Sequence, residues 1–150
     1  MSLDAQALLD ASITGANSTQ MVPVPAGEYT GIIEEVEIRP WQGKHDPTKT
    51  GQKLDCKVII DDEAVREELG RDKVVMVHEV MLDLAADGMG LDMGKGKNVH
   101  LGRLREAVGL NDPAMPFGFR MLSGRALKVR VEHEIYNNEP QARIRAVTKL

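Results

Sequence analysis

Alternation of apolar and polar residues is the feature that most constrains how this 150-residue chain folds. It is clearest in residues 53–60 and 126–136. The apolar positions of the first stretch are Leu54, Cys56, Val58 and Ile60, and those of the second are Leu127, Val129, Val131, His133 and Ile135. Because successive side chains of a strand point to opposite faces, both stretches predict strands with one buried face.

Two further strands are expected in the first half of the chain. Residues 28–39 alternate imperfectly, and the slip at residues 34–35 predicts a bulge of the kind found in strongly curved strands. Pro40 is expected to end this strand. Residues 73–84 are apolar on both faces, which predicts a central, covered strand.

The remaining elements follow from turn and capping residues. A turn at Asn137 and Asn138 separates the strand at 126–136 from a last strand at 141–149. A short helix is expected between an aspartate cap and Gly70. A longer helix is expected over 98–109, with Asn98 as its N-cap, after a glycine-rich loop.

The long helix therefore lies between the third and fourth of five strands. Short curved strands leave unpaired edges unless the sheet closes, and a five-stranded barrel of the OB type, with the helix at one end, meets that need. An antiparallel sheet packed on one helix in another topology is the alternative. Residues 1–24 are expected to form a flexible arm, and residues 25–150 the OB-fold domain.

Composition excludes several classes of protein. No run of about 20 apolar residues is present, and the first 20 residues do not resemble a secretory signal. The single cysteine cannot form an internal disulfide, which fits the cytoplasm. The net charge of −4 counts against a uniformly basic nucleic-acid binder, although a local basic patch is sufficient for binding.

Several short motifs resemble the small single-stranded-DNA-binding proteins of tailed bacteriophages. These motifs are Val-Pro-Ala-Gly-Glu-Tyr at 24–29, Lys-Thr-Gly-Gln-Lys-Leu at 49–54, the expected helix at 101–110, and Leu-Ser-Gly-Arg-Ala-Leu-Lys-Val at 122–129. The resemblance implies an OB-fold, sequence-tolerant binding of single-stranded DNA, and a role in phage replication or recombination in the host-cell cytoplasm. Replication or recombination proteins are expected as further partners, and so is a second copy of the chain. The chain departs from the acidic C-terminal tail found in some relatives, because it ends Thr-Lys-Leu.

Proteins that bind single strands combine cationic grooves with aromatic stacking platforms. Aromatic residues make up only 3% of the chain. Trp41 and Tyr136 fall in the two loops that an OB-fold uses for ligands, and packing on the barrel rim is the alternative role for both. The basic candidates are Lys44, Lys49, Lys53, Lys95 and Lys97, together with a stripe of Lys128, Arg130, Arg143 and Arg145. For the stripe, the alternative is a solvated outer face balanced by glutamates.

No catalytic activity and no cofactor are expected. The glycine loop at 87–97 fits neither the P-loop nor the dinucleotide fingerprint. The histidines are too dispersed for a zinc site. Asp55 and Lys57 match the Asp-x-Lys element of metal-dependent nucleases, which leaves a small nuclease as the enzymatic alternative. The third alternative is a protein-interaction module without a nucleic-acid role.

Overall fold

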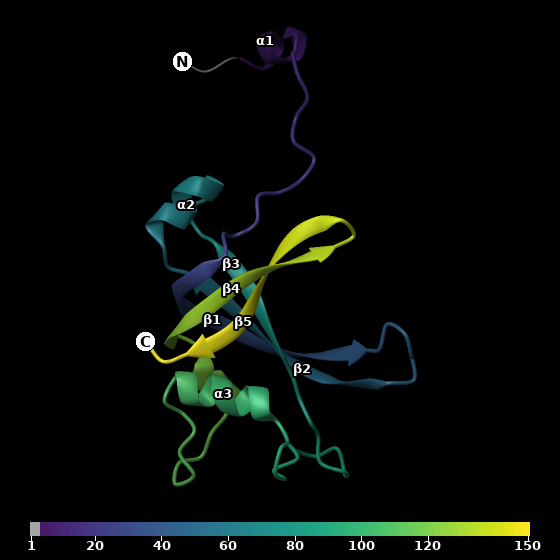
Figure 1. Ribbon diagram of the computed structural model, residues 1–150, viewed down its shortest axis with the longest axis vertical. Coiled ribbons are helices and arrows are strands. Elements are labelled where there is room, and N and C mark those ends of the chain that lie inside the picture. The colour runs from purple at the N-terminus through teal and green to yellow at the C-terminus, as the bar shows by residue number, and fades with distance from the viewer. Residues whose placement is uncertain (1–3) are drawn as a thin grey trace.

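A computed structural model describes residues 4–150, whose strands form a single antiparallel five-stranded sheet (Figure 1). The strands are β1 (Gly27–Gln42), β2 (Thr50–Ile60), β3 (Val75–Met81), β4 (Ala126–Tyr136) and β5 (Glu139–Thr148). The helices are α1 (Ala5–Asp10), α2 (Glu63–Leu69), α3 (Val99–Ala107) and the 3-10 helix η1 (Phe119–Leu122). The five predicted strands and the helix between the third and fourth of them are confirmed.

Strand β1 is the centre of the sheet, whose order is β3-β2-β1-β4-β5. It pairs with β2 from Gly31 to Gln42 but with β4 only from Gly27 to Ile32. The predicted bulge is present, because the β1–β2 register shifts between Ile33 and Glu35. Beyond it, the second half of β1 diverges from β4 and continues with β2 as a long hairpin (Figure 1).

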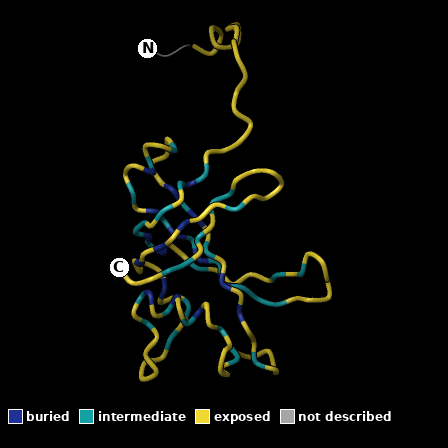
Figure 2. The backbone as a smooth tube through the Cα atoms, in the orientation of Figure 1, coloured by how far each residue is buried: buried dark blue, intermediate teal, exposed yellow. Residues whose placement is uncertain are grey.

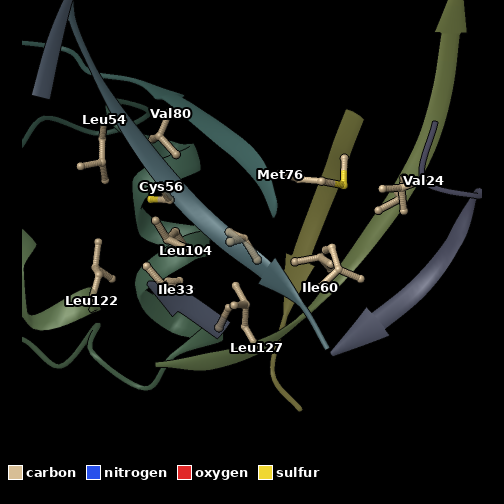
Figure 3. Close-up of a cluster of buried hydrophobic side chains, with 14 of the residues drawn as sticks. Val24, Ile33, Leu54, Cys56, Ile60, Met76, Val80, Leu104, Leu122 and Leu127 are labelled. Carbon is tan, nitrogen blue, oxygen red and sulfur yellow. The ribbon is translucent and has the colours of Figure 1, made fainter. Parts of the chain in front are cut away.

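The core lies between the inner face of the sheet and helix α3 (Figure 3). All four apolar positions predicted for β2 are buried. On β4, Leu127, Val129 and Val131 are buried, whereas Ile135 is 71% exposed, because that end of β4 projects beyond the core as a hairpin (Figure 2). Helix α3 contributes Leu101 and Leu104.

The predictions for β3 and Pro40 need correction. Strand β3 is shorter than expected and lies at an edge of the sheet, where Val77 is 53% exposed. The apolar pattern on both faces therefore does not reflect central burial. Strand β1 continues through Pro40, which lies opposite Gln52. The Gln52 carbonyl accepts from Leu82 N, which follows β3, at 3.1 Å. The backbone groups of Gln52 therefore point toward β3 and away from β1. Pro40 lies at a non-hydrogen-bonded position of the β1–β2 pair, where its missing N–H costs no hydrogen bond.

The two edge strands approach each other, but no hydrogen-bonded ladder joins them within residues 4–150. The sheet is therefore open, and its closure into a barrel stays a prediction. Residues 21–24 lie along this gap beside β3 and β5. Val24 is buried there, and its carbonyl lies 2.7 Å from His133 Nε2. Preceding residues 4–22 are exposed (Figure 2).

Candidate nucleic-acid interface

Trp41 lies in strand β1, rather than in the loop expected for it, because the strand continues past Pro40. It is paired with Gly51 of β2, and its indole ring lies directly over that glycine. A Cβ atom at Gly51 would lie 2.6 Å from the indole Nε1, so only glycine leaves room for the ring. The indole N–H is buried and has no hydrogen-bond partner among the residues that the structure describes.

The indole lines a hollow of about 760 Å³. Strands β1 and β2 form most of its wall, and Leu84 from the loop between β3 and α3 closes one side. Gly51 and Leu84 are parts of this site that were not among the residues predicted from the sequence. Gly51 could be predicted from the β1–β2 register, which pairs it with Trp41, but only if β1 is assumed to continue through Pro40. No sequence signal indicates Leu84.

The loop after β3 is held at its base by Asn98. The Asn98 amide N–H donates to the Asp83 carboxylate at 2.9 Å, and the Asn98 side chain accepts from the Asp83 backbone N–H at 2.8 Å. Asn98 Nδ2 also donates to the carbonyls of Asp83 and Asp92. Asn98 occupies the predicted N-cap position of α3, and its carbonyl accepts from Gly102 N at 2.9 Å. Its backbone is left-handed and its side chain makes no capping bond to α3. The side chain instead fixes the loop that carries Lys95 and Lys97.

Four exposed lysines lie on the two loops that border the hollow. They are Lys44 and Lys49 between β1 and β2, and Lys95 and Lys97 between β3 and α3. None of them forms an ion pair within the described part of the chain. The ammonium of Lys44 lies 5.1 Å from the ring centroid of Tyr136, a cation–π contact that joins the β1–β2 loop to the β4–β5 hairpin.

Lys53 differs from these loop lysines. Its ammonium lies 3.1 Å from Glu79 and 3.5 Å from Asp55. Partial burial opposes the charge of Lys53, but the two carboxylates outweigh that effect and raise the pKa of Lys53 above its usual value. Lys53 is therefore charged but already neutralised by its neighbours on the outer face of the sheet.

The basic stripe of β4 and β5 is also neutralised. All four side chains are exposed on the outer face of these strands, and each lies next to a glutamate. The pairs are Lys128 with Glu28 (3.9 Å), Arg130 with Glu132 (2.8 Å), Arg143 with Glu134 (2.7 Å) and Arg145 with Glu134. Exposed pairs are weak, at about 0–1 kcal/mol, yet a phosphate would have to compete with these glutamates. This geometry favours the solvated outer face over the binding stripe.

The nuclease alternative depends on Asp55 and Lys57, which share the outer face of β2. The Lys57 ammonium lies 3.1 Å from the Glu35 carboxylate. The Asp55 carboxylate lies 3.5 Å from the Lys53 ammonium and 3.8 Å from the Arg39 guanidinium. Among residues 4–150, no group of three or more histidine, cysteine or carboxylate side chains is arranged to hold a metal ion.

The other aromatic residues have packing roles. Tyr29 donates from its hydroxyl to the Pro25 carbonyl at 2.6 Å, and its partly buried ring packs against the core. Phe117 and Phe119 meet edge to face, 5.8 Å apart between centroids. The guanidinium of Arg105 lies 4.3 Å from the Phe117 ring centroid.

A comparison with models of known protein families gives no match, and a comparison with curated proteins gives none either. None of the helices in residues 4–150 is long and apolar enough to cross a membrane.

Proposed function

We propose that this protein binds single-stranded DNA with little sequence preference, on the hollow around Trp41. One observation carries the proposal, namely that Trp41 lines a hollow bordered by two loops with four unpaired lysines. Stacking platforms flanked by cations are what sequence-tolerant binding of single strands requires. In this arrangement a base stacks on the indole, and the loop lysines contact phosphates on both sides of it.

We also propose that the sheet is an open barrel of the OB type. Strand β1 pairs with both β2 and β4, so joining the edges of β3 and β5 would close a five-stranded barrel. An OB-fold binds its ligand on the face of strands two and three and in the loops that follow strands one and four. The β1–β2 loop and the β4–β5 hairpin meet here through Lys44 and Tyr136, which supports this assignment. The role in phage replication or recombination, in the host-cell cytoplasm, comes from the sequence resemblance.

The test uses the fluorescence of Trp41, the only tryptophan in the chain. Adding a thymine oligomer at low salt should quench its emission, because a stacked base contacts the indole. Trp41→Ala should weaken binding, measured by anisotropy of a labelled oligomer, by about 1–3 kcal/mol, the usual value of one stacked base. Trp41→Phe should restore most of that loss.

Two outcomes would contradict the proposal. If the parent protein does not bind a thymine oligomer at low salt, the DNA-binding function is wrong. If Trp41→Ala loses thermal stability but binds normally once folded, Trp41 is only a packing residue. Mg²⁺-dependent cleavage of the oligomer that is lost in Asp55→Ala would favour the nuclease instead.

A further inference from the structure

A second, apolar groove lies away from the Trp41 hollow. It has a volume of about 590 Å³ and is lined mainly by Val36, Ile38, Leu54 and Phe119. It exists because β1 loses its pairing with β4 after Ile32, and the short helix η1 lies against the second half of β1 instead. Ile38 is 44% exposed in this groove.

One positive charge lies at the edge of the groove. Arg120 lines it and forms no ion pair in the part of the chain that the structure describes. Glu37 also lines the groove, but its carboxylate lies 3.0 Å from Arg39. The groove therefore offers apolar surface beside an arginine whose charge is not neutralised, which fits an apolar segment with an adjacent acid.

The arm that precedes the sheet is such a segment. Leu8, Leu9 and Ile13 are between 60% and 76% exposed, and helix α1 buries no residue. Residues 4–22 contain the acids Asp4 and Asp10 and no lysine, arginine or histidine. A six-residue helix is marginal in water without packing, so α1 needs a surface to stabilise it.

We propose that helix α1 of one copy of this chain docks in the apolar groove of a second copy, with Leu8 and Leu9 inserted beside Ile38 and with Asp10 paired to Arg120. The apolar match and the charge match are independent observations, and both point to the same pair of surfaces. The contact does not depend on the proposed DNA-binding function.

A second copy fits the geometry better than the same chain does. The arm is anchored at Val24, which lies at the opposite end of the core from Leu54 of the groove (Figure 3). From there the arm leads away from the body of the protein (Figure 1). The twelve residues 11–22 span up to about 40 Å when extended, which is enough to reach a neighbouring copy.

Because the arm and the groove are different surfaces, each copy offers one of each, and the contact is head-to-tail. Such contacts form open chains unless the rotation between copies closes a ring. A few buried side chains fall well short of the roughly 800 Å² per partner of a stable interface, so association is weak and concentration-dependent. If the proposed function holds, copies bound along one DNA strand are held close together, and the same contact makes binding cooperative.

The first test is sedimentation velocity without DNA over a range of protein concentrations. The average mass of the parent should rise above that of one chain as the concentration increases. Leu8→Ser combined with Leu9→Ser should keep the protein monomeric without affecting its folding, because both side chains are exposed. Thr14→Ala combined with Thr19→Ala, two changes on the same arm outside the docked residues, should associate like the parent. Association that is the same with and without the two leucines would overturn the proposal, as would a parent that stays monomeric.

The second test exchanges the charges. Arg120→Asp and Asp10→Arg should each weaken association, and the two changes in one chain should restore it. Nonspecific apolar association would not respond in this way, so an absence of restoration would refute the Asp10–Arg120 pair.

The third test identifies the occupant of the groove. Chains with Leu9→Cys are mixed with chains with Ile38→Cys under mild oxidation, and a disulfide-linked dimer is expected on a non-reducing gel. Glu67→Cys, on exposed α2, replaces Ile38→Cys in the control and should give far less product. Cys56 does not compete, because it is buried and burial raises the pKa of its thiol to about 12. A disulfide that forms only within a chain carrying both cysteines would show that the arm occupies its own groove and would overturn the proposal.

Discussion

Gly51→Ala is the most specific perturbation of the Trp41 site, because it moves the indole without removing it. The added Cβ would lie 2.6 Å from Nε1, 2.8 Å from Cε2 and 2.9 Å from Cζ2 of Trp41. Gly51 does not have a positive φ, so alanine fits its backbone without strain. The whole effect of the substitution therefore falls on the ring.

The size of the effect follows from these distances. Ordinary contact begins at about 3.4 Å, so the ring must retreat by about 0.8 Å. Because Trp41 is half-buried at the end of the sheet, the ring can swing outward, and the cost in stability should stay near the lower end of the roughly 1–3 kcal/mol range for overpacking. The displaced indole no longer faces the hollow correctly, so binding of a thymine oligomer should weaken by at least about 1 kcal/mol, or roughly fivefold.

The assay combines emission spectra with binding curves. The emission maximum of Gly51→Ala should shift to longer wavelength, since the indole becomes more exposed to water, and quenching by the oligomer should decrease. Gly102→Ala is the matched control, because nothing lies within 4 Å of the added Cβ and the residue is in helix α3. It should leave emission and binding unchanged and stabilise α3 by up to about 1 kcal/mol. Unchanged emission and affinity in Gly51→Ala would refute the placement of the indole over Gly51.

Two further predictions concern stability. Burial, with a smaller contribution from His100, lowers the pKa of His78 to about 4. As the pH falls, the His78 side chain therefore takes up a proton in the unfolded state before it does so in the folded state. The free energy of unfolding, measured with urea, should therefore fall by up to about 3 kcal/mol as the pH decreases from about 6.5 to about 4. His78→Leu should remove this part of the fall in stability. His45→Leu, in an exposed loop, should leave it unchanged. Deleting residues 1–20 should change the free energy of unfolding by less than about 0.5 kcal/mol, because the described part of that segment is exposed and Val24 stays in place. Loss of cooperative thermal unfolding in the truncated chain would contradict this expectation.

Local patterns predicted the elements of the fold well. Alternation located the buried face of β2, and the phase slip located the bulge of β1. The two asparagines of the last turn both have positive φ, as a tight hairpin of type I′ requires. The pattern of β3 was misleading, because an apolar outer face has the same sequence signature on an exposed edge strand as on a covered one. Which strands become edges depends on the pairing of the whole sheet, and no local window contains that information.

The candidate site was predicted less completely than the fold. Sequence placed Trp41 near the first hairpin, but the ring's position depends on the glycine opposite, and hence on a register that Pro40 obscured. The sequence predicted the basic residues of the candidate site. Whether each of them is free to bind a phosphate depends on which carboxylates lie next to it across the strands. Arg143 and Glu134 are nine residues apart in the chain but 2.7 Å apart in space. A count of charges cannot distinguish such a paired arginine from an unpaired loop lysine.

The difference between paired and unpaired cations leads to a prediction about salt. Each phosphate contact to a single strand contributes about 0.7 to the slope of log K against log salt. If the contacts are the four loop lysines, the slope should be near −2.8, and Lys95→Gln combined with Lys97→Gln should reduce its magnitude by about 1.4. Arg143→Gln combined with Arg145→Gln should leave the slope unchanged, because those charges are balanced by Glu134 before and after binding. A slope near −5.6 in the parent, reduced equally by both pairs of substitutions, would mean that the outer face of β4 and β5 also contacts phosphates and that DNA displaces its glutamate pairs. A slope near −2.8 would explain how a chain with a net charge of −4 binds a polyanion, since only the loops bordering the hollow then need to be positive.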